Sequence, residues 1–339
     1  MKIISIIHFW LVLASFTHAA ERPNIVIFYV DDLGWADTSV RMMESDPNSA
    51  SDFHLTPHLA ALAKRGIKFS NAYAPAPTCT PSRKSIQFGK TPGRLGYTFV
   101  HDVLALQRKL EWKDETSLAD VVKAADPNYI TAHFGKGMGN ERMETIGYDV
   151  TDELEPHGDN GNFHGDYISI KNRTKLPPNN PKRMASLRKS SVDFVNAHSG
   201  KRPFLMMVSH YAVHVPHAAR ADLIEKYRKL PRGKFLTDSD YLPVDEMPKG
   251  KVISSWRLQY AAMLEECDEG LGAIVAALKK TGQLDNTLII FTSDNGGGLG
   301  PNGTLRGGKA NLYEGGLRVP FVVAGPGVKA GAQCDVPVS

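Results

Sequence analysis

The strongest constraint on the fold of this chain is one segment, Asn24–Val30, which is apolar without interruption from its second residue onward. A strand with one solvated face alternates polar and apolar residues, whereas a strand covered on both faces does not. Strands covered on both faces are typical of parallel sheets, because helices connect their strands. The segment therefore predicts a buried parallel strand.

The rest of the chain alternates between strand-like and helical patterns. Short apolar runs typical of buried strands occur at 129–134, 203–209, 287–292 and 319–324. Apolar residues recur with helical spacing at 117–125, 181–197, 251–280 and 56–65, where Thr56 is the expected cap. This alternation predicts an α/β fold, in which a mostly parallel central sheet is sandwiched by helices.

The N-terminus has the pattern of an export signal. Lys2 precedes an apolar run at 3–16, and the next three residues place small side chains at Thr17 and Ala19. We predict a signal peptide over 1–19 and a secreted or periplasmic protein, or a lysosomal one in a eukaryotic host. The alternative is a buried N-terminal helix. No other segment approaches 18 consecutive apolar residues, so we expect no membrane span in the mature chain.

The composition excludes several other classes of protein. A chain of 339 residues with 42% hydrophobic side chains is neither disordered nor collagen-like, and it can bury a large core. Its 40 basic and 36 acidic residues give a net charge of +4, without the basic stripe of a nucleic-acid-binding protein. Of its 3 cysteines, Cys267 lies on an apolar helical stripe and is an expected core residue.

Two pairs of polar residues follow predicted strands at the point where each strand ends. Asp31 and Asp32 follow the first strand, and Asp294 and Asn295 follow the strand at 287–292. The carboxyl ends of parallel strands share one edge of the sheet, where α/β proteins bind ligands. Adjacent carboxylates repel one another, and an all-oxygen donor set suits Ca²⁺ or Mg²⁺. The alternative is that these residues only cap or begin turns.

The pentapeptide Cys79-Thr80-Pro81-Ser82-Arg83 combines residue types that seldom meet by chance at this composition. A helix that begins near Pro81 would direct free backbone N–H groups at an anion beside Cys79, and Arg83 would add a fixed cation. The alternative is an unmodified and reactive thiol at the start of a helix.

These residues and their order resemble the type I sulfatases of the alkaline-phosphatase-like superfamily. Six ordered blocks carry the resemblance over nearly the whole expected mature chain: 22–34, 79–83 with 93–94, 135–136, 214–216, 294–296 and 308–320. The resemblance implies that residues 20–339 are the N-terminal catalytic domain, and that the smaller C-terminal domain of the family is missing.

The resemblance also implies an activity, which is hydrolysis of a sulfate ester on a glycan or another small molecule. A sulfatase-maturating (formylglycine-generating) enzyme would oxidise Cys79 to Cα-formylglycine, whose hydrate attacks sulfur and then expels sulfate. The implied ligands of one Ca²⁺ ion are Asp31, Asp32, Asp294, Asn295 and the modified Cys79. The other implied catalytic residues are Arg83 beside the metal cluster, Lys136 and Lys309 as sulfate-binding groups, and His214 near the leaving oxygen.

One position departs from the family. Where the family commonly has Gly-Lys-Trp-His, this chain has Met138 in place of the histidine that assists release of sulfate. Three histidines are candidates for the vacant role, although each could equally be a packing or loop residue: His133, His210 and His217.

Two alternative functions follow from the same motifs. Related enzymes use the modified cysteine to hydrolyse phosphonates or phosphate diesters. A non-catalytic relative would bind a sulfate ester without turning it over, and the methionine at position 138 is the reason to consider it.

Overall fold

The fold is that of a computed structural model, which describes residues 22–100, 112–139, 141–152, 161, 163–164, 174–231, 233, 241–242, 252–253, 255–298 and 302–339. The predicted signal peptide at 1–19 lies outside these residues. Among the helices described, none combines the length and the apolar character that a membrane span requires.

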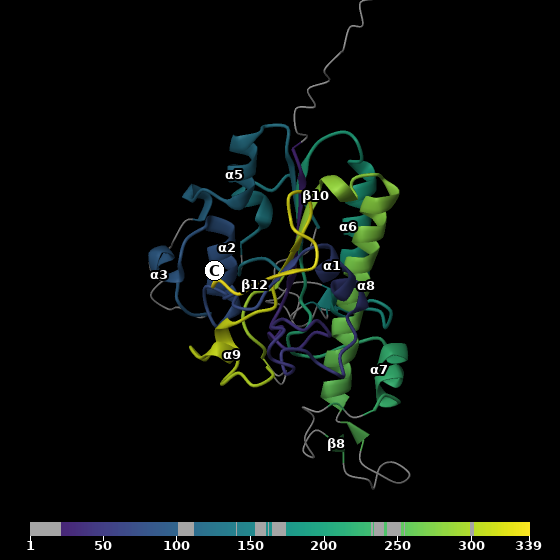
Figure 1. The fold of residues 1–339 in the computed structure, drawn as a ribbon. Helices are drawn as coiled ribbons and strands as arrows, with labels where there is room; N and C mark the ends of the chain where they lie inside the picture. Colours follow the sequence, from purple (N-terminus) through teal and green to yellow (C-terminus); the bar gives the residue numbers. More distant parts are fainter. Residues whose placement is uncertain are drawn as a thin grey trace, which may run out of the picture.

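A single large sheet runs through the molecule, with strand order β12-β2-β11-β10-β1-β7-β3-β4 (Figure 1). Its strands are β1 (Asn24–Val30), β2 (Ile67–Phe69), β3 (Ile130–Gly135), β4 (Val150–Thr151), β7 (Phe204–Ser209), β10 (Thr287–Ser293), β11 (Val322–Ala324) and β12 (Ala332–Cys334). Only β11 runs against the others, so the prediction of a mostly parallel sheet is confirmed. Two short antiparallel pairs lie outside it: β5 (Phe163–His164) with β6 (Thr174–Lys175), and β8 (Tyr241–Leu242) with β9 (Val252–Ile253).

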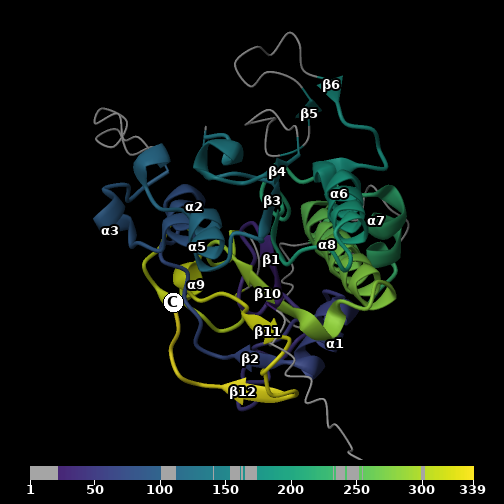
Figure 2. The same ribbon diagram turned by 90° about the horizontal axis from the view of Figure 1, so that it is seen from above.

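Helices cover both faces of this sheet. They are α1 (Pro57–Arg65), α2 (Cys79–Phe88), α3 (Pro92–Leu95), α5 (Leu118–Ala125), α6 (Met184–Ala197), α7 (Ala221–Arg228), α8 (Ser255–Lys280) and α9 (Glu314–Leu317). Seen from above, α2, α3 and α5 lie on one side of the sheet, and α1, α6, α7 and α8 lie on the other (Figure 2). The predicted sandwich is confirmed, although the sequence patterns did not predict α7.

The central strand β1 shows why its sequence lacks alternation. Val26, Phe28 and Val30 pack on one face of the sheet, in the core shared with α1, α6 and α8. Ile27 and Tyr29 pack on the other face, in the core shared with α2 and α5. Both faces are therefore apolar, and burial of each large side chain contributes about 1.5–3 kcal/mol.

The start of helix α1 is capped differently from the prediction. The Thr56 side chain makes no capping hydrogen bond, and its Oγ1 instead accepts a hydrogen bond from the Ser39 N–H. The acceptor at the helix start is Asp268 of α8, whose two carboxylate oxygens bind the N–H groups of His58 and Leu59 at 2.8 Å each. One buried side chain thus satisfies two free N–H groups of one helix and ties it to another.

We predict that Asp268→Ala lowers the free energy of unfolding by about 1–3 kcal/mol, since it leaves these N–H groups without acceptors. Asp285→Ala is the matched control, because Asp285 is exposed and its side chain forms an ion pair with Arg65 at the surface. It should change stability by less than about 0.5 kcal/mol. Urea unfolding of both variants measures the difference, and equal losses would show that the cap is not what holds α1.

Candidate active site

The register of the sheet brings the predicted acidic residues together. Strands β1 and β10 are parallel neighbours, and Val30 pairs with Ser293, so Asp31 and Asp294 leave the sheet side by side. Asp31, Asp32 and Asp294 each offer a carboxylate oxygen, and these three oxygens lie within 4.8 Å of one another. All three residues are buried. Such a concentration of negative charge requires compensation.

Arg83 supplies the first compensation from helix α2. Its Nε donates to Asp294 Oδ2 at 2.7 Å, and its Nη2 lies 3.5 Å from Asp31 Oδ1. Its Nη1 donates to Ser209 Oγ at 2.6 Å, and that hydroxyl donates to the Lys136 carbonyl at 2.6 Å. Ser209, the last residue of β7, thus connects α2 to the loop after β3. The sequence patterns place it in a polar set after a strand but assign it no role of its own.

Two lysines supply the remaining cations. Lys136, which follows β3, forms an ion pair with Asp31, and Lys309 Nζ lies 2.7 Å from Asp32 Oδ2. Burial acts to raise the pKa of Asp31, but the charges of Lys136 and Arg83 outweigh it and hold that pKa well below its usual range. Burial, together with the charge of Asp31, raises the pKa of Asp294 to about 7. Asp31 therefore ionises at a lower pH than Asp294 does.

Two oxygen atoms in this cluster lack hydrogen-bond donors. Asp31 Oδ1 and Asn295 Oδ1 are buried and accept no hydrogen bond from the described residues. The Asn295 Nδ2 group donates to Asp32 Oδ1 at 2.8 Å, so only the amide oxygen is left over. Buried oxygens without donors are costly unless a cation binds them. The donor set therefore fits a hard cation such as Ca²⁺.

Cys79 lies at the start of α2, one helical turn before Arg83 and so on the same face of the helix. The helix starts at this cysteine, two residues earlier than the sequence suggests. Burial raises the pKa of the Cys79 thiol; Lys136 opposes this, and Asp31 and Asp294 add to it. A thiolate is thus disfavoured, which argues against the reactive-thiol alternative.

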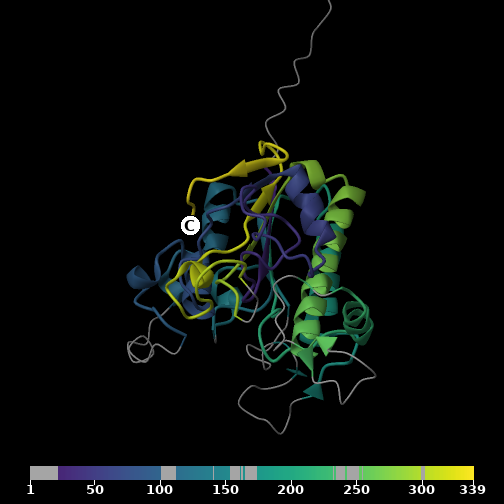
Figure 3. The same cartoon turned by 60° about the horizontal axis from the view of Figure 1, so that its bottom comes forward.

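His214 and Lys309 complete the group of predicted residues. His214 follows β7, and its Nε2 lies 3.7 Å from Asp32 Oδ2. Burial lowers the pKa of His214, and the charges of Asp31 and Asp32 act in the opposite direction. Lys309 lies in a loop next to the start of α2, where the Ala310 N–H donates to the Pro77 carbonyl at 2.8 Å. Figure 3 shows the yellow segment of the C-terminal part beside the blue helices. Burial opposes ionisation of Lys309, but Asp32 and Asp31 raise its pKa well above the usual value.

The structure thus brings together all the site residues predicted from the sequence: Asp31, Asp32, Cys79, Arg83, Lys136, His214, Asp294, Asn295 and Lys309. They come from the carboxyl ends of four adjacent strands, from the start of α2 and from one loop.

The candidates for the vacant histidine role lie in different surroundings. Met138 itself is fully buried in the core beneath α2 and α5, away from solvent. His133 packs edge-on against Tyr148, and His210 packs against Phe28. Burial, aided by the charge of Arg83, lowers the pKa of each of these two histidines to about 3. Both are neutral core residues, as the packing alternative expected.

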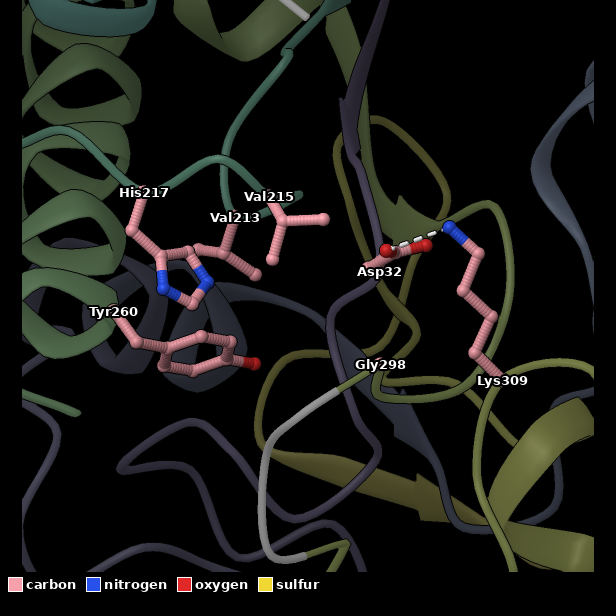
Figure 4. A pocket seen from close by; sticks show the side chains of 7 residues that line it. All are labelled: Asp32, Val213, Val215, His217, Tyr260, Gly298 and Lys309. Carbon is pink, nitrogen blue, oxygen red and sulfur yellow. Dashed lines mark hydrogen bonds and ion pairs between the residues drawn. The ribbon is translucent and has the colours of Figure 1, made fainter. Parts of the chain in front are cut away.

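His217 instead lines a cavity of about 170 Å³ beside the acidic cluster (Figure 4). The residues around this cavity are Asp32, Val213, Val215, His217, Tyr260, Gly298 and Lys309. Asp32 and Lys309 belong to the cluster described above, so the cavity opens directly onto it. The sequence patterns predicted Tyr260 as a core residue, because it lies on an apolar helical stripe. Such a stripe does not indicate which of its residues line a cavity.

Comparison with known proteins gives one family. The sulfatase family model matches residues 23–339. An ulvan-active sulfatase of Formosa agariphila is 28% identical over 332 residues, which are 94% of this chain and 59% of the relative. Human arylsulfatase A is 29% identical over 342 residues, 94% of this chain and 62% of the relative. The chain therefore spans about three fifths of the length of these curated relatives.

Solved structures give the same fold. The crystal structure of Ps i-CgsB is 26% identical with a TM-score of 0.69, and the match covers 94% of this chain and 69% of that one. The same protein has been solved with k-i-k-neocarrahexaose. The fold is also shared by a phosphonate monoester hydrolase of Agrobacterium radiobacter, which is 18% identical with a TM-score of 0.61. That match covers 93% of this chain and 70% of the hydrolase.

We predict that Ca²⁺ stabilises the protein, by about 3 kcal/mol at a hundredfold excess over its dissociation constant. Asn295→Ala removes one oxygen without removing a charge, and it should weaken Ca²⁺ binding about tenfold or more. Asn286→Ala, outside the cluster, is the matched control. Calorimetric titration of metal-free protein measures both, and identical Ca²⁺ affinities in the two variants would exclude Asn295 as a ligand.

Proposed function

The chain belongs to the sulfatase family, and from this premise we propose that it hydrolyses the sulfate ester of a glycan or another small molecule. The observation that carries the proposal is the meeting of Cys79 with three buried carboxylates and with the cations of Arg83, Lys136 and Lys309. A sulfate ester is an anion that needs a nucleophile, cationic groups around its oxygens and a proton for its leaving group.

Two groups supply the chemistry that ordinary side chains cannot. Asp31, Asp32, Asp294, Asn295 and the modified Cys79 would hold Ca²⁺, which would supply a Lewis acid and a template, and Cα-formylglycine at position 79 would supply the nucleophile as its hydrated aldehyde. The buried and protonated thiol supports a need for this modification, since the thiol itself is a weak nucleophile. The maturating enzyme that oxidises the cysteine is accordingly a proposed partner.

The lysines bind the sulfate oxygens in this proposal. Each ammonium group now faces one carboxylate, Lys136 facing Asp31 and Lys309 facing Asp32. A cation bound in the cluster would be coordinated by the same carboxylates. Both ammonium groups could then pair with a bound anion. Fixed positive charge at this position stabilises the charge that develops on sulfate oxygens in the transition state. Arg83 is more buried than the two lysines, and its proposed role is to keep the carboxylates in place.

His214 is the proposed proton donor to the leaving alcohol oxygen. Lys309 retains its proton firmly, because Asp32 and Asp31 raise its pKa, and a firmly held proton makes a poor general acid. His214 lies beside the same carboxylate, and burial lowers the pKa of its imidazole, so it gives up a proton more readily than Lys309 does. These facts support the histidine over the lysine.

The substrate side of the proposal rests on the relatives and the cavity. Those relatives are named for ulvan and for an aryl sulfate, and the structure with a bound oligosaccharide belongs to Ps i-CgsB. We propose a carbohydrate sulfate for this chain and an exported location, periplasmic or extracellular. Hydrolysis of phosphonates has weaker support, since the phosphonate hydrolase is similar in fold alone.

The direct test is sulfate release from p-nitrophenyl sulfate and from sulfated glycans by the matured protein with Ca²⁺. Cys79→Ala should reduce turnover to background, because alanine carries no sulfur or oxygen on Cβ that could be oxidised to the aldehyde. Cys334→Ala, on β12, is the matched cysteine control and should remain active. Binding of sulfate esters without turnover by the matured wild type would favour the non-catalytic alternative, and turnover by Cys79→Ala would exclude the proposed nucleophile.

A second prediction concerns the leaving group. His214→Ala should lower kcat/KM about 100-fold for an alkyl sulfate, whose alkoxide leaves poorly without a proton. The loss should be less than about tenfold for p-nitrophenyl sulfate, since that phenolate leaves without help. Steady-state kinetics on both substrates measures the two losses, and losses of equal size would contradict the role of general acid.

A further inference from the structure

The cavity beside the acidic cluster has two unlike walls (Figure 4). Asp32 and Lys309 form the wall that belongs to the proposed reaction centre, and His217 and Tyr260 face them across the cavity. Val213 adds apolar surface above the ring of His217. If sulfate binds at the first wall, the alcohol half of the ester extends toward the second.

The His217 ring is held in one orientation by its neighbours. It stacks on Trp256 with ring centroids 6.0 Å apart and an interplanar angle of 20°, and it meets Tyr260 edge-on at 6.1 Å and 85°. The Tyr260 hydroxyl donates to Asp37 Oδ2 at 2.6 Å, so the hydroxyl already has a partner. His217 is therefore the positioned polar group on this wall that can take a new partner.

His217 Nε2 has no hydrogen-bond partner among the described residues, although the atom is buried. An unpaired buried polar atom costs about 1–3 kcal/mol, and a ligand that pairs with it recovers that cost. Burial lowers the pKa of His217 to about 4, and the charges of Lys182, His214 and Arg257 act in the same direction, against a weaker effect of the Val213 backbone. The ring is thus uncharged near neutral pH.

An uncharged imidazole distinguishes between kinds of alcohol. A hydroxyl group both donates and accepts hydrogen bonds, so it pairs with the ring in either tautomer. A carboxylate or a second sulfate on the ligand would bind a neutral imidazole less strongly than a charged one. A ligand with a hydrocarbon ring would form no hydrogen bond with the imidazole. The apolar side chains of Val213 and Val215 suit the C–H groups of the same ligand.

We propose that this cavity is the subsite for the alcohol half of the ester, and that His217 selects an alcohol with a free hydroxyl group near the ester, as in a sugar ring. The inference rests on the proposed sulfatase function. It makes His217 a specificity-determining residue and removes it from the candidates for the role vacant at Met138.

The test separates binding of the sugar from turnover. In the Cys79→Ala background, calorimetry measures binding of hexoses sulfated in turn at O2, O3, O4 and O6, and of cyclohexyl sulfate, which lacks hydroxyl groups. At least one hexose sulfate should bind more tightly than cyclohexyl sulfate. His217→Ala should weaken that hexose about tenfold, the loss expected for one hydrogen bond, and cyclohexyl sulfate less than about threefold. His217→Gln, which keeps a donor and an acceptor, should recover part of the loss.

His198→Ala is the matched control, since His198 packs on Phe194 just after α6 ends. It should bind both probes as the parent does. Equal weakening of both probes by His217→Ala would show a structural role, and no preference of the parent for any hexose would overturn the proposal. Lack of any sulfate hydrolysis by the matured wild type would instead contradict the proposed function, so the two failures are distinguishable.

Discussion

The site depends on one buried guanidinium. Arg83 lies between Asp294 and Asp31, donates to the first at 2.7 Å and keeps a distance of 3.5 Å to the second. Without it, Asp294 would have no cationic partner among the described residues, although it lies within 4.8 Å of Asp31 and Asp32, which Lys136 and Lys309 neutralise. Removing one partner of a buried ion pair costs about 3–5 kcal/mol, because the remaining charge stays buried. The Tyr29 ring, 5.1 Å from the guanidinium carbon, adds a cation–π contact from below.

The parallel sheet brings the residues of the proposed site to one edge. Strands β10, β1, β7 and β3 are consecutive neighbours, and each delivers polar residues where it ends: Asp294 and Asn295, Asp31 and Asp32, His214, and Lys136. Helix α2 brings Cys79 and Arg83 to the same edge on one helical face. The loop that carries Lys309 closes the arrangement and also forms one wall of the cavity that His217 faces.

Strand ends could be predicted from the sequence because their physics is local. The unbroken apolar run at 24–30 required a strand buried on both faces, and a parallel sheet then placed Asp31 beside Asp294. Loops and helix starts depend on distant partners. The cap of α1 comes from Asp268, 209 residues away from Leu59 along the chain, and the antiparallel direction of β11 has no periodic signature. The sequence made His217 a candidate site residue. Its position at the cavity, however, depends on its packing against Trp256 and Tyr260, which the sequence did not predict.

The proposed function requires Cys79 to be the modified residue of a sulfate-ester site and not a structural thiol. Mass spectrometry of the peptide that contains Cys79, from protein produced in its native host, tests this most directly. We expect Cα-formylglycine at that position, seen as an aldehyde in place of the thiol. An intact thiol throughout the sample would contradict the proposed function, however well the carboxylates and cations around it are arranged.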